Sequence, residues 1–167
     1  GVVNVIPRSG RFMERPGVTV TASSAYESAA QGFTGYGRAA LEAPRYFVQM
    51  SQSYRDYGAY TDGSGDEIAN SQFQDYQSHL HAGYRLSPRH AVEARYQWFE
   101  ARDVGIPGAG GVFPETARVT YPETRRWLAE VTWEHRPAWP VWHRSELRLF
   151  RQTVDRRVRV EPNQVRY

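Results

Sequence analysis

By residue type and spacing, the strongest candidates for metal ligands in the sequence are two histidines, His79 and His81. They stand two residues apart in an alternating segment, so both rings project from the same side of an extended strand. Imidazole is a common zinc ligand, but a structural zinc site takes four ligands and the sequence positions no further one. We therefore expect both histidines to line a polar strand face, and we predict no metal site.

Three other patterns touch on known chemistry. Residues 62–67 carry three carboxylates but lack the spacing and the distal Glu of a calcium loop. Glu130 and Glu134 share a strand face about 13 Å apart, beyond the roughly 5–9.5 Å that separates glycosidase carboxylates. Residues 105–111 are Gly-rich without the Lys of a phosphate-binding loop. With no Ser-His-Asp or Cys-His arrangement either, we expect no enzyme and no cofactor.

The amino-acid composition excludes several classes of function. The chain has no Cys, which excludes disulfides and thiolate chemistry. Its 21 basic residues are all Arg and are interleaved with Glu and Asp, so we expect no nucleic-acid partner. No apolar run is long enough for a transmembrane helix. Aromatic residues reach 14%, which fits either an aromatic girdle or a carbohydrate-binding surface.

Seven segments alternate apolar and polar residues with a period of two, which predicts an all-β fold. They are longer than the roughly 5–6 residues of a common strand and comparable with the roughly 9–11 tilted residues that cross a bilayer. Alternation by itself also fits a soluble antiparallel sheet. The segments span about 17–27, 32–42, 45–58, 73–86, 91–102, 125–136 and 143–157.

The connections alternate between short and long. Residues 43–44 and 87–90 form short turns, whereas 59–72 and 103–124 form long loops. Short turns on one side and long loops on the other are typical of outer-membrane barrels. Aromatic residues stand near segment ends, as in the girdles of such barrels, at Tyr46, Tyr54, Tyr76, Tyr84, Trp98 and Trp127. The sequence thus predicts an antiparallel meander of about seven long strands.

The expected register assigns the side chains to two faces. On the convex outer face we expect Val48, Met50, Leu80, Tyr84, Val131, Trp133, Leu147 and Leu149. On the concave face we expect Gln49, Ser51, His81, Arg95, Glu130 and Arg148.

Residues 1–6, Gly-Val-Val-Asn-Val-Ile, resemble the last plug strand of TonB-dependent outer-membrane receptors. Four further segments resemble parts of the barrel of that family, in the expected order. Residues 70–73 resemble the return from an early extracellular loop, and residues 86–90 resemble a periplasmic turn. Residues 103–108 resemble the start of the next extracellular loop, and residues 121–126 resemble its return. The resemblance covers essentially the whole chain, although Pro7 stands where the family usually has a Thr or a similar residue.

The resemblance implies a domain organisation and a location. Residues 1–8 would be the last plug strand, 9–16 a linker, and 17–167 the N-terminal portion of a transmembrane β-barrel. Such barrels have about 22 strands, so seven strands form an incomplete part. The expected location is the bacterial cell outer membrane. The expected partners are outer-membrane lipid, the receptor's own plug domain and remaining strands, and the TonB system.

The resemblance also implies a function: energised uptake of a scarce ligand, most commonly an iron chelate such as a siderophore or haem. Ligand contacts would come from the extracellular loops and the upper lumen, at Tyr57, Tyr60, Asn70, Phe113 and Tyr121. Two alternatives stay open. One is a soluble β-sandwich module that stacks carbohydrate on its aromatic residues, and the other is an outer-membrane barrel enzyme.

Overall fold

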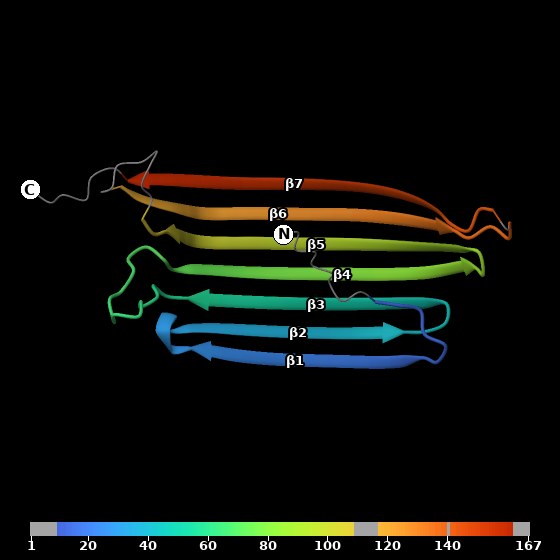
Figure 1. The fold of residues 1–167 in the computed structure, drawn as a ribbon, viewed down its shortest axis with the longest axis horizontal. Helices are drawn as coiled ribbons and strands as arrows, with labels where there is room; N and C mark the ends of the chain where they lie inside the picture. The colour runs from blue at the N-terminus through green and yellow to red at the C-terminus, as the bar shows by residue number, and fades with distance from the viewer. Residues whose placement is uncertain (1–9, 109–116, 140, 162–167) are drawn as a thin grey trace, which may run out of the picture.

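The described residues fold into one antiparallel sheet of seven strands in sequence order (Figure 1). The computed structural model describes residues 10–108, 117–139 and 141–161. The predicted meander is confirmed, and the two packed sheets of a sandwich are not the topology observed. The strands are β1 (Gly17–Glu27), β2 (Gly32–Glu42), β3 (Tyr46–Tyr57), β4 (Phe73–Ser87), β5 (His90–Ile106), β6 (Arg118–His135) and β7 (Ser145–Glu161), with a 3-10 turn η1 (Ser28–Ala30).

The sheet has two distinct ends. At the turn end, short connections join β2 to β3 and β4 to β5, and residues 136–144 join β6 to β7. At the loop end lie η1, the connection 58–72, the end of β5 and the start of β6. Among the described residues, no helix has the length and apolar character needed to cross a membrane.

The predicted loop 103–124 is wrong in extent. β5 continues to Ile106 and β6 already begins at Arg118, with Ile106 paired to Val119. The glycine and proline residues near this point suggest a loop, because both are common in loops. Val104 and Ile106, however, suit an extended strand. The predictions for residues 1–8 and for Phe113 fall outside the described part of the chain.

The strand register places apolar side chains on one face and polar ones on the other. Met50 pairs with Leu80 on the outer face, where 50% of the Met50 surface is exposed. Gln49 pairs with His81 on the opposite face, where each is 1% exposed. The predicted face assignment is confirmed for all fourteen residues by the continuous register from β3 to β7. Polarity is therefore reversed relative to a soluble sheet, whose buried face is apolar.

Aromatic side chains form two bands on the outer face. Tyr46 pairs with Tyr84 toward the turn end, and Tyr54 pairs with Tyr76 toward the loop end. Trp98 and Trp127 are cross-strand partners at the loop side of the same face. Tyr46 and Tyr54 are eight residues apart, which is roughly 26 Å along a strand. That spacing is comparable with the roughly 25 Å height of the apolar band of membrane barrels.

A small core lies at the turn end of the concave face. Phe47 is almost fully buried there and makes edge contacts with Phe12 and His81, at ring-centroid distances of 5.0 and 4.7 Å. Residues 10–16 reach this point because the Met13 amide donates to the Ala43 carbonyl at 3.2 Å. A side chain at position 83 would overlap the Phe47 ring, so Gly83 provides the space that Phe47 fills.

We expect Gly83→Val to destabilise the folded protein by about 1–3 kcal/mol, because overpacking forces Phe47 out of its site. Gly37→Val is the matched control, since an added Cβ at Gly37 meets nothing within 4 Å. The measurement is the urea midpoint of unfolding from detergent micelles. Equal midpoints for the two variants would contradict this account of the core.

Candidate functional site

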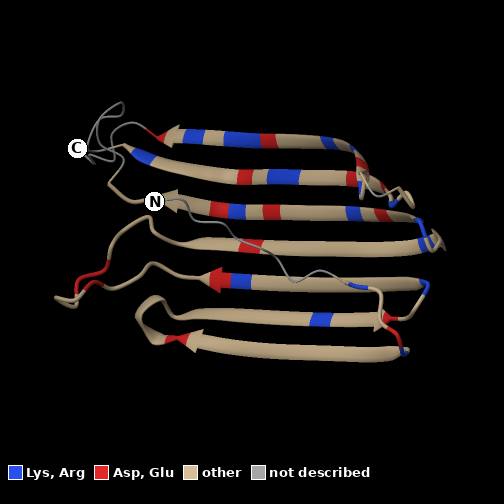
Figure 2. Ribbon diagram, turned by 45° about the vertical axis from the view of Figure 1, so that its right-hand side comes forward, with Lys and Arg blue, Asp and Glu red and all other residues tan. Residues whose placement is uncertain are grey.

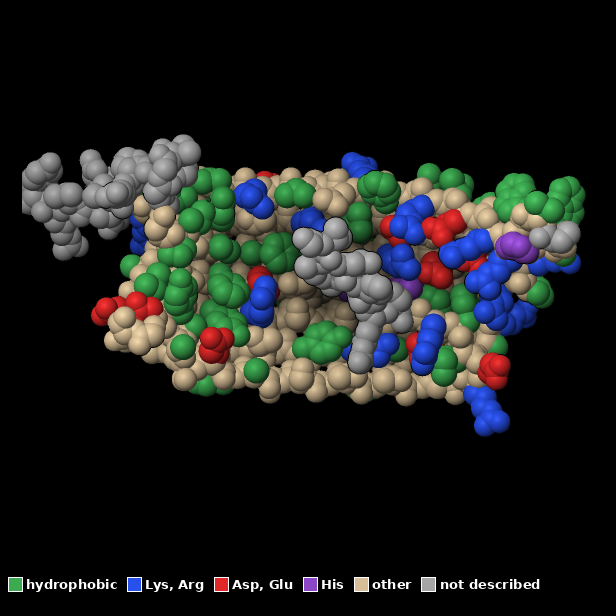
Figure 3. Space-filling view, in the orientation of Figure 1, with side chains coloured by type: hydrophobic (Ala, Val, Ile, Leu, Met, Phe, Trp, Pro, Cys, Tyr) green, Lys and Arg blue, Asp and Glu red, His purple; other side chains and the backbone are tan. Residues whose placement is uncertain are grey.

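Charged residues are concentrated on β5, β6 and β7, whereas β1 and β2 carry few (Figure 2). On the hollowed concave face they gather toward the turn end (Figure 3). This surface is the candidate functional site, because a face that is both concave and ionic can hold a polar solute or a polar protein segment.

The centre of the site is a chain of ion pairs across β4, β5 and β6. His81 Nε2 lies 2.9 Å from Glu93 Oε2, and the same oxygen accepts from Arg95 Nη2 at 3.1 Å. Arg95 Nη1 then donates to Glu130 Oε1 at 2.8 Å. These charges are partly buried. Charges in such places are tolerated when they are paired and hydrogen-bonded, and each of these carboxylates has a cationic or imidazole partner.

The chain of ion pairs continues to β7 and the turn end. Glu146 accepts from both Arg148 and Arg144, each at 2.7 Å. Arg144 also lies 2.8 Å from Glu134, whose other oxygen accepts from Arg136. Arg148 Nε approaches Glu130 at 3.9 Å and so joins the two halves of the network.

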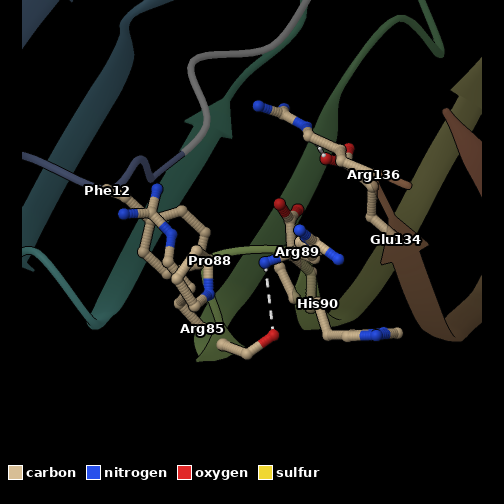
Figure 4. Close-up of a pocket in the computed structure, with 10 residues that line it drawn as sticks. Phe12, Arg85, Pro88, Arg89, His90, Glu134 and Arg136 are labelled. Atoms are coloured by element: carbon tan, nitrogen blue, oxygen red, sulfur yellow. Dashed lines mark hydrogen bonds and ion pairs between the residues drawn. The ribbon is translucent and has the colours of Figure 1, made fainter. Parts of the chain in front are cut away.

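A cavity of about 240 Å³ opens beside the network at the turn end. Phe12, Arg85 and Pro88 lie on one side, and Glu134 and Arg136 lie on the other (Figure 4). The Arg85 guanidinium stands 4.5 Å from the centre of the Phe12 ring, a cation–π contact. The segment that enters the sheet at residues 10–16 is thus anchored to the concave face.

A second cavity, of about 470 Å³, lies nearer the middle of the concave face. Tyr36, Phe99, Arg126 and His79 line it. Arg126 Nη2 donates to Gln97 Oε1 at 2.8 Å, which aligns the guanidinium beside the cavity. A cation next to two aromatic rings suits an anionic ligand with flat or aromatic parts.

His79 and His81 do share the concave face, as predicted. Their ring centres are 6.3 Å apart, and His81 Nε2 is occupied by Glu93. The Nε2 atom of His79 is buried and makes no hydrogen bond to any described residue, and His79 is one of the residues that line the larger cavity. Within the described ranges no group of three or more metal-ligating carboxylate or imidazole side chains is present.

The predicted ligand residues Tyr57, Tyr60, Asn70 and Tyr121 all lie at the loop end of the sheet. The Tyr57 ring stacks on Phe73 at 5.0 Å, and its hydroxyl is 2.8 Å from Thr34 Oγ1. Tyr60 is 43% exposed in the connection between β3 and β4. Their ligand contacts stay a prediction.

Asn70 links two separate parts of the loop end. Its side-chain amide donates to the carbonyl oxygens of Ile106 and Val119, at 3.1 and 2.7 Å. Its backbone has a φ of 61°, a left-handed conformation that Asn tolerates. The Tyr121 ring lies beneath the Arg156 guanidinium, 5.1 Å from ring centre to carbon.

Residues 62–67 form a tight turn at the tip of the loop. The Asp62 carboxylate accepts from the amides of Ser64 and Asp66, at 2.8 and 3.1 Å. Thr61 pairs with Glu67 in an isolated β-bridge that closes the turn. The Asp62 carboxylate therefore satisfies backbone donors of its own turn.

The cavity residues Tyr36, Phe99 and Arg126 were not among the predicted ligand contacts. The sequence did contain a signal for the position of Arg126, because the two-residue period of β6 directs it to the side opposite Trp127. Which concave residues cluster depends on the register between strands, and a single segment does not specify that register.

Comparisons with known proteins support the fold. No protein-family model matches the sequence, and no curated protein matches it. Among solved structures, the copper transporter OprC superposes with a TM-score of 0.74 at 15% identity, over 89% of this chain and 22% of that one. This chain therefore spans about a fifth of that neighbour's length. At this identity the likeness shows a related fold, a section of a β-barrel.

We expect Asn70→Ala to loosen the loop end, because two partly buried carbonyl groups lose their donor. Amide hydrogen exchange around residues 104–106 and 118–120 should become about tenfold faster. Ser64→Ala, at the exposed tip of the same loop, is the control and should leave exchange unchanged. Unchanged protection in Asn70→Ala would show that the amide does not hold the strand ends together.

Proposed function

We propose that this chain is the end of the plug and the first barrel strands of a TonB-dependent outer-membrane receptor, which takes up a scarce iron chelate. The single observation that carries the proposal is the reversed polarity of the sheet. The convex face exposes Val48, Met50 and Leu80, while the concave face buries Gln49 and His81. Lipid outside and a polar lumen inside account for both faces together.

The chemistry of the concave face supports the ligand class. Arg126 stands beside Phe99 and Tyr36 in the larger cavity, and Arg55 makes a two-point ion pair with Asp75 nearer the loop end. Ferric siderophores and haem combine negative charge with flat or aromatic groups, which guanidinium and aromatic side chains bind well. In this proposal the chain catalyses no reaction and holds no cofactor of its own.

The neighbouring structure suggests a second candidate ligand. OprC is a copper transporter by name. His79, whose buried Nε2 has no hydrogen-bond partner among the described residues, is one of the residues that line the larger cavity. A copper ion would bind neutral imidazole. Binding and uptake assays should therefore include copper beside the ferric chelates.

We expect Arg126→Gln in the full-length receptor to weaken binding of an anionic ferric siderophore about tenfold, because a charged hydrogen-bond donor is lost. Arg125→Gln is the matched control, since Arg125 lies on the outer face and pairs with Glu123 at 2.5 Å. The measurements are the Kd of the purified receptor and uptake of radiolabelled iron by cells.

Uptake that persists without the TonB system, or a receptor absent from the outer-membrane fraction, would contradict the proposal as a whole. Uptake of copper without uptake of any ferric chelate would show that the ligand is copper, and the proposed transport role would stand. Equal Kd values for Arg126→Gln and Arg125→Gln would show that Arg126 in the larger cavity does not contribute to ligand binding.

We expect the isolated 167-residue chain to aggregate or stay partly unfolded in plain buffer, because a single-layer sheet exposes an apolar face and two unpaired edges. Size-exclusion chromatography with circular dichroism provides the measurement, and detergent micelles provide the comparison. A sharp monomer peak with cooperative unfolding in plain buffer would favour a soluble protein.

A further inference from the structure

A groove of about 650 Å³ crosses four strands on the convex face, on the opposite side of the sheet from the ion-pair network. Two neighbouring rows of cross-strand partners supply eight of its eleven lining residues, and Arg95, Glu130 and Phe150, which stand between the rows in the sequence, supply the rest. The row nearer the loop end is Leu80, Tyr96, Ala129 and Arg151, and the row nearer the turn end is Ala82, Ala94, Val131 and Leu149.

The groove exists because three of the eleven residues that line it are alanine. The short side chains of Ala82, Ala94 and Ala129 form a floor, while Leu80 and Leu149 stand higher, with exposed fractions of 42% and 65%. A shallow apolar channel of this kind fits a hydrocarbon chain. An acyl chain in it regains the dispersion contacts that the short side chains leave unmade.

Arg151 places a positive charge at the β7 end of the groove. Its guanidinium lies 5.6 Å from the centre of the Trp127 ring, one row closer to the loop end. Among the described residues no carboxylate pairs with Arg151.

Two outer-face arginines nearer the loop end have carboxylate partners. Arg102 lies 2.7 Å from Glu100, and Arg157 lies 3.7 Å from Glu123. A cation on a lipid-facing surface is costly unless a partner compensates it. Tryptophan prefers the headgroup level of a bilayer. Because the Arg151 guanidinium reaches over the Trp127 ring in the next row, its charge is directed from its own row toward that level.

We propose that this groove binds one phosphate-bearing lipid of the outer leaflet, with an acyl chain over the three alanines and a phosphate on Arg151. The inference rests on the proposed function, because it needs the convex face to meet lipid. The outer leaflet follows from the position of Arg151 on the loop side of the groove, since long loops face the outside in such barrels. Guanidinium and phosphate form strong, often bidentate hydrogen bonds.

Native mass spectrometry of the full-length protein with added lipid A tests the charged end of the site. We expect Arg151→Gln to weaken lipid A binding about tenfold and to bind dephosphorylated lipid A as the wild-type protein does. Arg157→Gln is the matched control on the same strand and face, because Arg157 is already paired with Glu123. It should bind lipid A like the wild type.

The apolar part of the site needs a separate variant. Ala94→Leu fills the floor of the groove and should lower binding of both lipid forms, whereas Ala22→Leu, on the outer face of β1 away from the groove, should not. Mobility in gels with and without heating verifies that every variant folds as a barrel.

The outcomes separate this inference from the proposed function. If the barrel forms but Arg151→Gln and Arg157→Gln bind lipid A equally, the lipid site is wrong and the receptor proposal stands. If the wild-type protein forms no barrel in detergent or membranes, both are wrong. Loss of binding in Arg151→Gln that also affects dephosphorylated lipid A would overturn the assignment of the phosphate to Arg151.

Discussion

Backbone pairing between neighbouring antiparallel strands is the interaction on which the rest of this structure depends. The sheet is a single layer, so the ladders between strands must satisfy the backbone donors and acceptors without help from a second layer. The two longest of these ladders join β5 to β6 and β6 to β7. Because the backbone groups are paired within the layer, either face can contact hydrocarbon, and the two-residue period then sorts side chains between two different environments.

Sorting polar side chains to the concave face withdraws charged groups from water, and ion pairs offset the free-energy cost of this withdrawal. His81 is almost fully buried between Phe47 and Glu93, and Arg95 bridges Glu93 to Glu130. Charges withdrawn from water are expensive unless their partners are close and well oriented. The network meets that condition across β4–β7, which leaves a rigid ionic surface instead of a hydrophobic core. Among the described residues the largest buried apolar side chain is Phe47 at the turn end, and Val119 is buried separately at the loop end.

The fold could be predicted from the sequence because its main signal is local. The bounds predicted for β1 and β2 match the structure, and the two faces follow from alternation within each strand. The extra length of β5 and β6 could not be predicted in the same way, because Asn70 holds their ends from 36 and 49 residues away. The larger cavity and the alanine floor of the groove are also non-local, since each appears only once the register joins separate strands.

Arginine has several roles in this chain, and the surroundings of each side chain decide between them. Arg55 grips Asp75 through two nitrogens, Arg85 covers Phe12, and Arg151 covers Trp127. The planar guanidinium suits all of these contacts, whereas a lysine ammonium would offer neither the fork nor the flat surface. A chain whose basic residues are all arginine can therefore place cations on both faces of one sheet. On the concave face carboxylates neutralise them; at Arg151 the neutralising group has to come from outside the described chain.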